Sequence, residues 1–142
     1  MSGANVRVRS YEARDHDALV QLWKKVFPNA PARNDPARDI ARKLDEQPEL
    51  LLVGELDGAI VAATLAGWDG HRAWLHLVSV HPDHQRKGIG AAIVLHAVER
   101  LGELGYPKVN LQIRGETPGV AAFYEKLGFV VEERISMGRV LS

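Results

Sequence analysis

The chain has 142 residues, and its 18 basic and 18 acidic side chains cancel to a formal net charge of zero. This balance gives no argument for a nucleic acid or an acidic membrane as partner, and the absence of cysteine excludes disulfides, a thiol nucleophile and a thiolate zinc site. No secretory signal or membrane-spanning run is recognisable, so we expect one cytoplasmic domain over residues 1–142 with no membrane partner.

The N-terminal third of the chain predicts a strand followed by two helices. Residues 6–10 alternate between apolar and polar side chains, as in a strand with one wet face. Apolar residues then recur at helical spacing over 16–26, with Asp15 in position to cap the helix. Asp35 followed by Pro36 predicts the start of a second helix, because an N-cap and a proline at the first helical position stand together.

The middle of the chain predicts three successive antiparallel strands. Apolar runs at 50–53 and 59–68 flank Asp57-Gly58, a dipeptide that can hold the positive φ angles of a tight hairpin turn. A polar turn then leads into a third strand over 73–80.

The C-terminal half predicts two more helix and strand pairs. A glycine loop opens a long amphipathic helix that ends near Gly105, and a strand follows at 109–113. The last helix spans 118–127 before Gly128, and residues 129–131 begin a final strand. The order β-α-α-β-β-β-α-β-α-β predicts an α+β domain with a mixed, mostly antiparallel sheet and helices on both faces.

The loop from Gln85 to Gly90 has the composition of an anion site. Gly88 and Gly90 allow a ligand to approach the backbone, and the free N–H groups of the following helix point toward it. The basic pair at 86–87 adds formal charge, so a phosphate or pyrophosphate is expected. The alternative is that the glycines serve only a tight turn.

Two segments of the sequence resemble the motifs of one family. VHPDHQRKGIGA, from Val80 to Ala91, resembles motif A of the GNAT acetyltransferases, and FYEKLGF, from Phe123 to Phe129, is similar to motif B. The predicted order of elements is similar to the GNAT (acyl-CoA N-acyltransferase) fold along essentially the whole chain. Within the family, NDP at 34–36, DI at 39–40, RK at 42–43 and WDGHR at 68–72 resemble the YpeA-like branch.

This resemblance implies a function as well as a fold. Similar proteins transfer the acetyl group of acetyl-CoA to a primary amine, by direct attack in a ternary complex and without a metal. A non-catalytic CoA-binding regulatory domain of the same fold, or a nucleotide-phosphate binding protein, stays an alternative. The acceptor, a small molecule or a protein, is not identified. Dimers are frequent in similar proteins, so a homodimer is compatible with the sequence.

The resemblance also implies where acetyl-CoA binds. In similar proteins the pantetheine arm bonds the backbone of the strand before motif A, as an added strand would, and the pyrophosphate lies on the loop amides. The implied contact residues are Val78, Ser79, Val80, Gln85, Arg86, Lys87, Gly88, Ile89, Gly90 and Ala91. Thr117 stands where the family often has asparagine, and its shorter side chain would weaken one contact to CoA.

Two residues are candidates for proton transfer. Tyr124 matches the family tyrosine that protonates the leaving thiolate, and a packing role is its alternative. His76 resembles in position a histidine in the base relay of some arylalkylamine-acetylating relatives, and a structural histidine is its alternative. Strand alternation predicts that Trp74, His76, Val78 and Val80 share one face.

Candidates for acceptor contact are weaker. Asp35 could bind an ammonium group, although capping its helix is the commoner role of such an aspartate. Asp69 and His71 could each contact the acceptor or hold the turn. We favour the turn for Asp69 and the acceptor contact for His71. His81 and His84 are interpreted as loop residues, because the six histidines show no spacing typical of a zinc site.

Overall fold

The computed structural model describes residues 5–114 and 119–141. The chain divides into two compact units, Met1–Gln112 and Ile113–Ser142, and each is described by itself. Among the described residues, none of the helices has both the length and the apolar character needed to cross a membrane.

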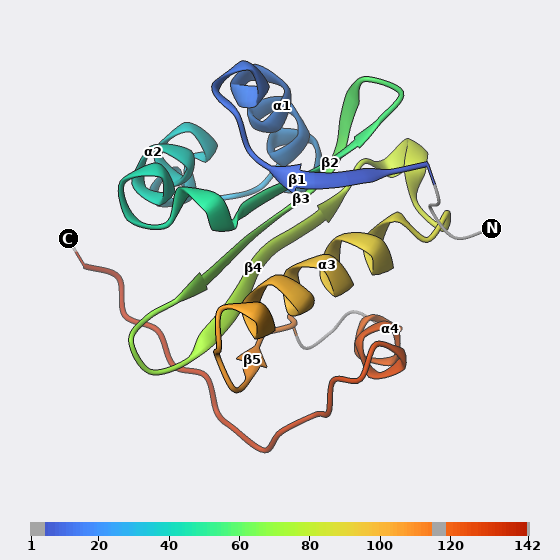
Figure 1. Ribbon diagram of the computed structural model, residues 1–142. Helices are drawn as coiled ribbons and strands as arrows, with labels where there is room; N and C mark the ends of the chain where they lie inside the picture. Colours follow the sequence, from blue (N-terminus) through green and yellow to red (C-terminus); the bar gives the residue numbers. More distant parts are fainter. Residues whose placement is uncertain (1–4, 115–118, 142) are drawn as a thin grey trace. The chain divides into compact units, whose positions relative to one another are not determined.

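The first unit is built on a five-stranded sheet in the order β1-β2-β3-β4-β5 (Figure 1). Neighbouring strands are antiparallel except β4 and β5, which run parallel. This is the mixed, mostly antiparallel sheet that the sequence predicts. The strands are β1 (Arg7–Ser10), β2 (Leu51–Leu56), β3 (Ala59–Trp68), β4 (Ala73–Val80) and β5 (Val109–Asn110).

Three helices of the first unit flank this sheet. They are α1 (His16–Val26), α2 (Pro36–Glu46) and α3 (Ile89–Glu103). Figure 1 shows α1 and α2 on one face of the sheet and α3 on the other. The second unit contains α4 (Val120–Lys126). The predicted α+β architecture with helices on both faces is therefore confirmed.

Local signals explain several boundaries. The hairpin turn between β2 and β3 holds Asp57 and Gly58 at φ of 51° and 84°, as the dipeptide predicts. The Asp35 carboxylate accepts a hydrogen bond of 3.2 Å from Arg38 N–H at the start of α2, which confirms the predicted cap. Asp15 precedes α1 but makes no such cap, because its carboxylate pairs instead with Arg9, 2.7 Å away.

The main hydrophobic core lies between the sheet and the α1–α2 layer. Its buried members are Leu19, Leu22, Trp23, Ile40, Leu51, Val53 and Ala63. On the opposite face of the sheet, α3 packs close to the strands. A Cβ at Gly54 of β2 would lie 3.7 Å from Ile93 Cδ1 and 3.2 Å from Ala62 Cβ, so glycine makes room there for α3 and β3.

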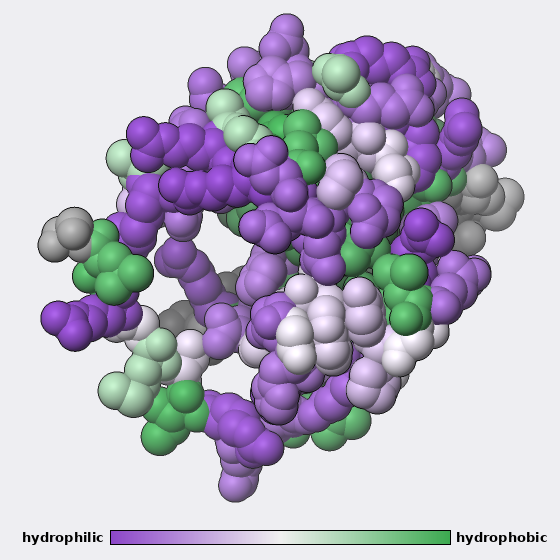
Figure 2. Space-filling model, turned by 60° about the vertical axis from the view of Figure 1, so that its left-hand side comes forward, coloured by the Kyte–Doolittle hydropathy of each residue, from purple (hydrophilic) through white to green (hydrophobic). Residues whose placement is uncertain are grey.

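The predicted final strand is wrong. Residues 129–141 form no strand, and β5 covers only Val109–Asn110 of the predicted 109–113. A strand exists only through hydrogen bonds to a neighbour, and a two-residue β5 offers a short edge. Several apolar side chains are consequently left exposed, such as Ile135 and Met137 at 91% each. The surface seen in Figure 2 is otherwise largely hydrophilic, with hydrophobic residues in small groups.

Candidate functional site

The start of α3 has the backbone of an anion site. The helix begins after Gly88, whose φ of 78° lies in the left-handed region that glycine adopts without strain. Ala92 N–H bonds the Gly88 carbonyl at 3.1 Å, so the amides of residues 89–91 have no acceptor within the helix. These amides and the positive end of the 15-residue helix together favour a bound anion.

The side chains of this loop divide into two kinds. Arg86, at φ of 64°, and Lys87 are exposed, so their charges can turn toward a phosphate. Gln85 turns back instead, and its Nε2 donates to the Val80 carbonyl at 3.3 Å. A structural role for the Gln85 side chain is therefore observed, whereas a contact with a ligand stays a prediction.

One edge of β4 is open over most of its length. Within the described residues, β5 pairs only with Ala73 and Trp74, and from Leu75 to Val80 no strand lies on that side. An extended ligand can bond such an edge as an added strand. The Ser79 hydroxyl is already engaged, because it donates to the Ala63 carbonyl and accepts from Trp23 Nε1, so its side chain is not available to a ligand.

A bulge interrupts β4 midway along this edge. Val80 lies opposite Ala62 on β3, and His76 lies opposite Leu65. Between these two pairs β3 advances three residues but β4 advances four, so β4 contains one extra residue. Leu77 lies at this point with φ of 54°, a left-handed conformation that is strained for a non-glycine residue.

The bulge changes which residues of β4 share a face. Positions 62 and 65 of β3 point to opposite faces, so their partners Val80 and His76 do so as well. The prediction that Trp74, His76, Val78 and Val80 share one face is therefore wrong. His76 and Trp74 lie on the face covered by α1 and α2, because Leu65 packs against the core beneath those helices.

His76 is surrounded so that its neutral form is favoured. Desolvation by neighbouring atoms lowers its pKa, the charge of Lys43 lowers it further, and Asp39 opposes both effects. The imidazole itself remains exposed to solvent at one side, stacked near the Trp74 ring with centroids 6.0 Å apart. The lowered pKa favours the neutral imidazole, which is the form that can accept a proton.

Lys43 and Asp39 come from α2, and the sequence identified them only as part of the resemblance to the YpeA-like branch, without a role in the site. Lys43 is 8% exposed, and burial lowers its pKa. Its Nζ donates to Gln47 Oε1 at 3.2 Å and would lie 2.8 Å from a Cβ at Gly67. Asp39 is half-buried, and burial raises its pKa. The signal that could have found them is their spacing of four around the buried Ile40, which puts both toward the sheet.

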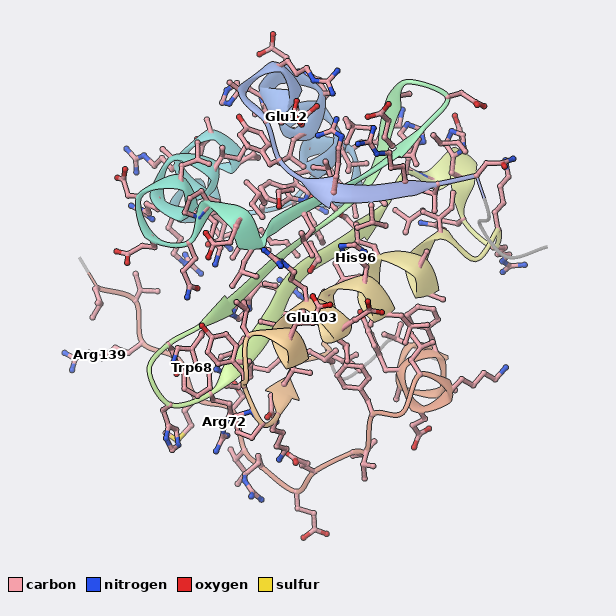
Figure 3. All side chains as sticks on the ribbon, in the orientation of Figure 1. Glu12, Trp68, Arg72, His96, Glu103 and Arg139 are labelled. Atoms are coloured by element: carbon pink, nitrogen blue, oxygen red, sulfur yellow. The ribbon has the colours of Figure 1, made fainter. Side chains whose placement is uncertain are left out.

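Asp69 has a structural role in the turn between β3 and β4. Its carboxylate accepts from the backbone N–H of His71 at 2.8 Å and of Arg72 at 2.7 Å, and from Trp74 Nε1 at 3.1 Å. These backbone hydrogen bonds lower its pKa. Figure 3 shows Trp68 and Arg72 at this end of the hairpin, while His96 belongs to α3. The His71 side chain is exposed, and its contact with an acceptor stays a prediction.

Tyr124 belongs to α4 in the second unit. Its ring meets Phe123 and Phe129 edge-on, at centroid distances of 4.9 and 5.6 Å, and burial raises the pKa of its phenol. Gly128 follows the helix at φ of 97°, as its predicted capping role requires. Thr117 lies outside the described residues.

No cluster typical of a metal site is found in the described parts of the chain. His81 instead accepts a hydrogen bond at Nδ1 from Asp83 N–H, at 3.1 Å, within the turn before the glycine loop. This contact fits the interpretation of His81 as a loop residue.

Comparison with known proteins gives a consistent result. Residues 16–129 match the family model described as "Acetyltransferase (GNAT) family". Acetyltransferase YE1169 of Yersinia enterocolitica is 35% identical over 136 residues, which cover 96% of each chain. A provisionally named acetyltransferase from Agrobacterium tumefaciens has a solved structure that is 26% identical, with a TM-score of 0.79 and coverage of 94% and 99%. The structure of AAC(6')-Iy with a CoA bisubstrate analog superposes at a TM-score of 0.81, with 16% identity and coverage of 96% and 99%.

Proposed function

Because the chain belongs to the GNAT acetyltransferase family, we propose that it transfers the acetyl group of acetyl-CoA to a primary amine by direct attack in a ternary complex. We also assign it to the YpeA-like branch, on the short sequence matches at 34–36, 39–40, 42–43 and 68–72. The family match runs from the first compact unit into the second, which supports one catalytic domain over residues 1–142.

The observation that carries the donor assignment is the continuity of two binding features. The open edge of β4 ends at Val80, and the anion site at the start of α3 follows within ten residues along the chain. A ligand with an extended amide-containing arm and a pyrophosphate would bond both, the arm through backbone groups and the phosphates through amides 89–91. Acetyl-CoA has this composition, and when bound it supplies a reactive thioester.

The proton transfers are assigned to His76 and Tyr124. The acceptor nitrogen becomes acidic as its bond to the acetyl carbon forms, and His76 takes the proton that it loses. The carbon–sulfur bond then breaks, and Tyr124 donates its phenolic proton to the departing thiolate. A phenol with a raised pKa stays protonated at neutral pH and is ready for that step. Solvent returns the proton from His76 to Tyr124 and completes the cycle.

The test is release of the free CoA thiol with a panel of primary amines and peptides. Since the chain contains no cysteine, a thiol reagent reports CoA without background from the protein. We expect saturable turnover with at least one acceptor and a kcat at least about tenfold lower in Tyr124→Phe, with an unchanged KM for acetyl-CoA.

Two other outcomes would support different functions. Saturable acetyl-CoA binding without turnover on any acceptor would favour a non-catalytic CoA-binding domain. ATP affinity equal to CoA affinity, measured by isothermal titration, would favour a nucleotide-phosphate site. Homodimer formation remains a separate prediction, which sedimentation equilibrium checks.

A further inference from the structure

The surroundings of His76 contain a carboxylate without a partner. Asp39 forms no ion pair within 4 Å with any residue that the structure describes, and its backbone N–H serves only the helix. Half-buried carboxylates are costly unless an ion or hydrogen bond compensates them. Asp39 interacts electrostatically first with Arg42 of the same helix, then with Asp35 and with His76, so these groups belong to one neighbourhood.

The contacts of Lys43 show where this part of α2 lies on the sheet. It follows Asp39 by one turn of α2, and its Nζ rests against Gly67 of β3. Gly67 lies directly opposite Trp74 of β4, whose ring is stacked near His76. The face of α2 bearing Asp39 and Lys43 therefore covers the end of the sheet where His76 is located.

The two charges of α2 do not neutralise each other. No ion pair joins Asp39 to Lys43, although they are one turn apart, and the only hydrogen bond of Lys43 Nζ among the described residues is to the neutral Gln47. A cationic group that approaches His76 thus meets an available carboxylate at Asp39 and a fixed positive charge at Lys43.

We propose that Asp39 binds the acceptor as its ammonium ion, that this ion loses one proton to solvent to give the neutral amine that attacks, and that Lys43 repels a second positive charge beside it. The acceptor class is then a primary amine whose only positive charge is the ammonium group that becomes acetylated, and not a diamine. This inference rests on the function proposed above. It assigns Asp39 to substrate binding, next to the base, and Lys43 to specificity.

The first experiment compares Asp39→Asn with Asp45→Asn, a matched change on the exposed side of the same helix. The substrate is pentylamine, and CoA release is followed at saturating acetyl-CoA. Loss of a charge-assisted contact predicts that Asp39→Asn raises the KM for pentylamine about tenfold or more. Asp45→Asn should keep the native value, and the KM for acetyl-CoA should be the same in all three proteins.

The second experiment tests the charge limit with molecules of equal length. The native chain should use pentylamine at least about tenfold more efficiently, in kcat/KM, than 1,5-diaminopentane, and Lys43→Met should narrow that ratio. Because Lys43 is buried, its variant is checked by urea unfolding, and Lys43→Gln serves as a second substitution of similar length.

The outcomes distinguish a failure of this inference from a failure of the proposed function. An unchanged KM for pentylamine in Asp39→Asn, with native turnover intact, would overturn the role of Asp39 alone. Equal use of the two amines by the native chain would overturn the role of Lys43. If the native chain acetylates no amine at all, the proposed function fails and this inference fails with it.

Discussion

At the scale of single residues, the surroundings of His76 determine how its proposed role as a base depends on pH. Desolvation and the Lys43 charge both lower its pKa, and a base is active only in its neutral form. Activity is therefore present above the lowered pKa and is lost as the pH falls through it. The acid limb of kcat/KM should have its midpoint below 6.5, measured between pH 5 and 8.

Substitution of Lys43 should move that limb in a defined direction. Without the neighbouring cation, the pKa of His76 rises, so Lys43→Met should shift the acid midpoint to higher pH while the plateau at high pH remains. The matched variant is Lys24→Met, an exposed lysine of α1, for which no shift is expected. A midpoint that stays in place in Lys43→Met would remove Lys43 from the electrostatics of the base.

His76 itself is tested by His76→Gln. General bases contribute about 10²–10⁴-fold to rate, so kcat should fall by about a hundredfold or more and the acid limb should disappear. An unchanged profile with a modest loss of rate would instead support a structural histidine.

At the scale of elements, the sequence predicts what local chemistry determines. The Asp57-Gly58 turn, the start of α2 after Asp35 and the bounds of β4 all follow from short signals, and the structure agrees. The missing final strand and the two-residue β5 depend on partner edges, which no local signal reports. The same limit applies to the extra residue of β4, since apolar runs carry no mark of a bulge.

The candidate site divides in the same way. The glycine loop was predicted from its composition, because a helix start and a positive φ are local properties. The grouping of His76 with Asp39 and Lys43 was not predicted, because it depends on how α2 crosses the sheet.

The glycine at the start of α3 can be compared with another glycine that has a similar positive φ angle. Gly88 and Gly58 have φ of 78° and 84°, so alanine at either should cost about 1 kcal/mol of folding free energy. Only Gly88→Ala should also weaken acetyl-CoA binding, measured by isothermal titration, because Gly58 belongs to the turn between β2 and β3 and not to the start of α3. Equal affinity in both variants would show that the helix start is not the phosphate site.

The contact between α2 and β3 gives a second prediction at this scale. A Cβ at Gly67 would lie 2.8 Å from Lys43 Nζ and 3.2 Å from Gln47 Oε1, and because both atoms end flexible side chains that can shift, Gly67→Ala should destabilise by no more than about 1 kcal/mol in urea unfolding. The double variant with Lys43→Ala should recover part of that loss. Gly102→Ala, where nothing lies within 4 Å of the added Cβ, should be neutral or stabilising.

At the scale of the whole molecule, one ion network couples stability to pH. Arg9 of β1 bonds Asp15 with both terminal nitrogens, at 2.7 and 2.9 Å, and also reaches Glu55 of β2 at 2.9 Å. The hydrogen bond from Arg9 holds the pKa of Asp15 below its usual value. The stabilisation from this lowered pKa is complete above the unfolded value near 3.8 and disappears as the pH falls through the folded value.

Asp15→Asn should therefore destabilise strongly at neutral pH and weakly in acid. Removing one partner of a buried pair costs about 3–5 kcal/mol, and the difference from the native chain should narrow as urea unfolding is repeated from pH 5 toward pH 2. Asp17→Asn, on the exposed side of α1, is the control and should leave the curve unchanged. A gap that is constant with pH would mean that packing, and not charge, explains the loss.

The extra residue of β4 divides that strand into two halves of opposite parity. Before Leu77, even positions face α1 and α2, whereas after it odd positions do. Residues of the same parity before and after Leu77 therefore lie on opposite faces of the sheet. Substitutions in the two halves of β4 have to be compared separately for this reason. Removing one residue at the bulge would merge the two halves, so the length of β4 determines whether His76 and Val80 lie on the same face of the sheet or on opposite faces.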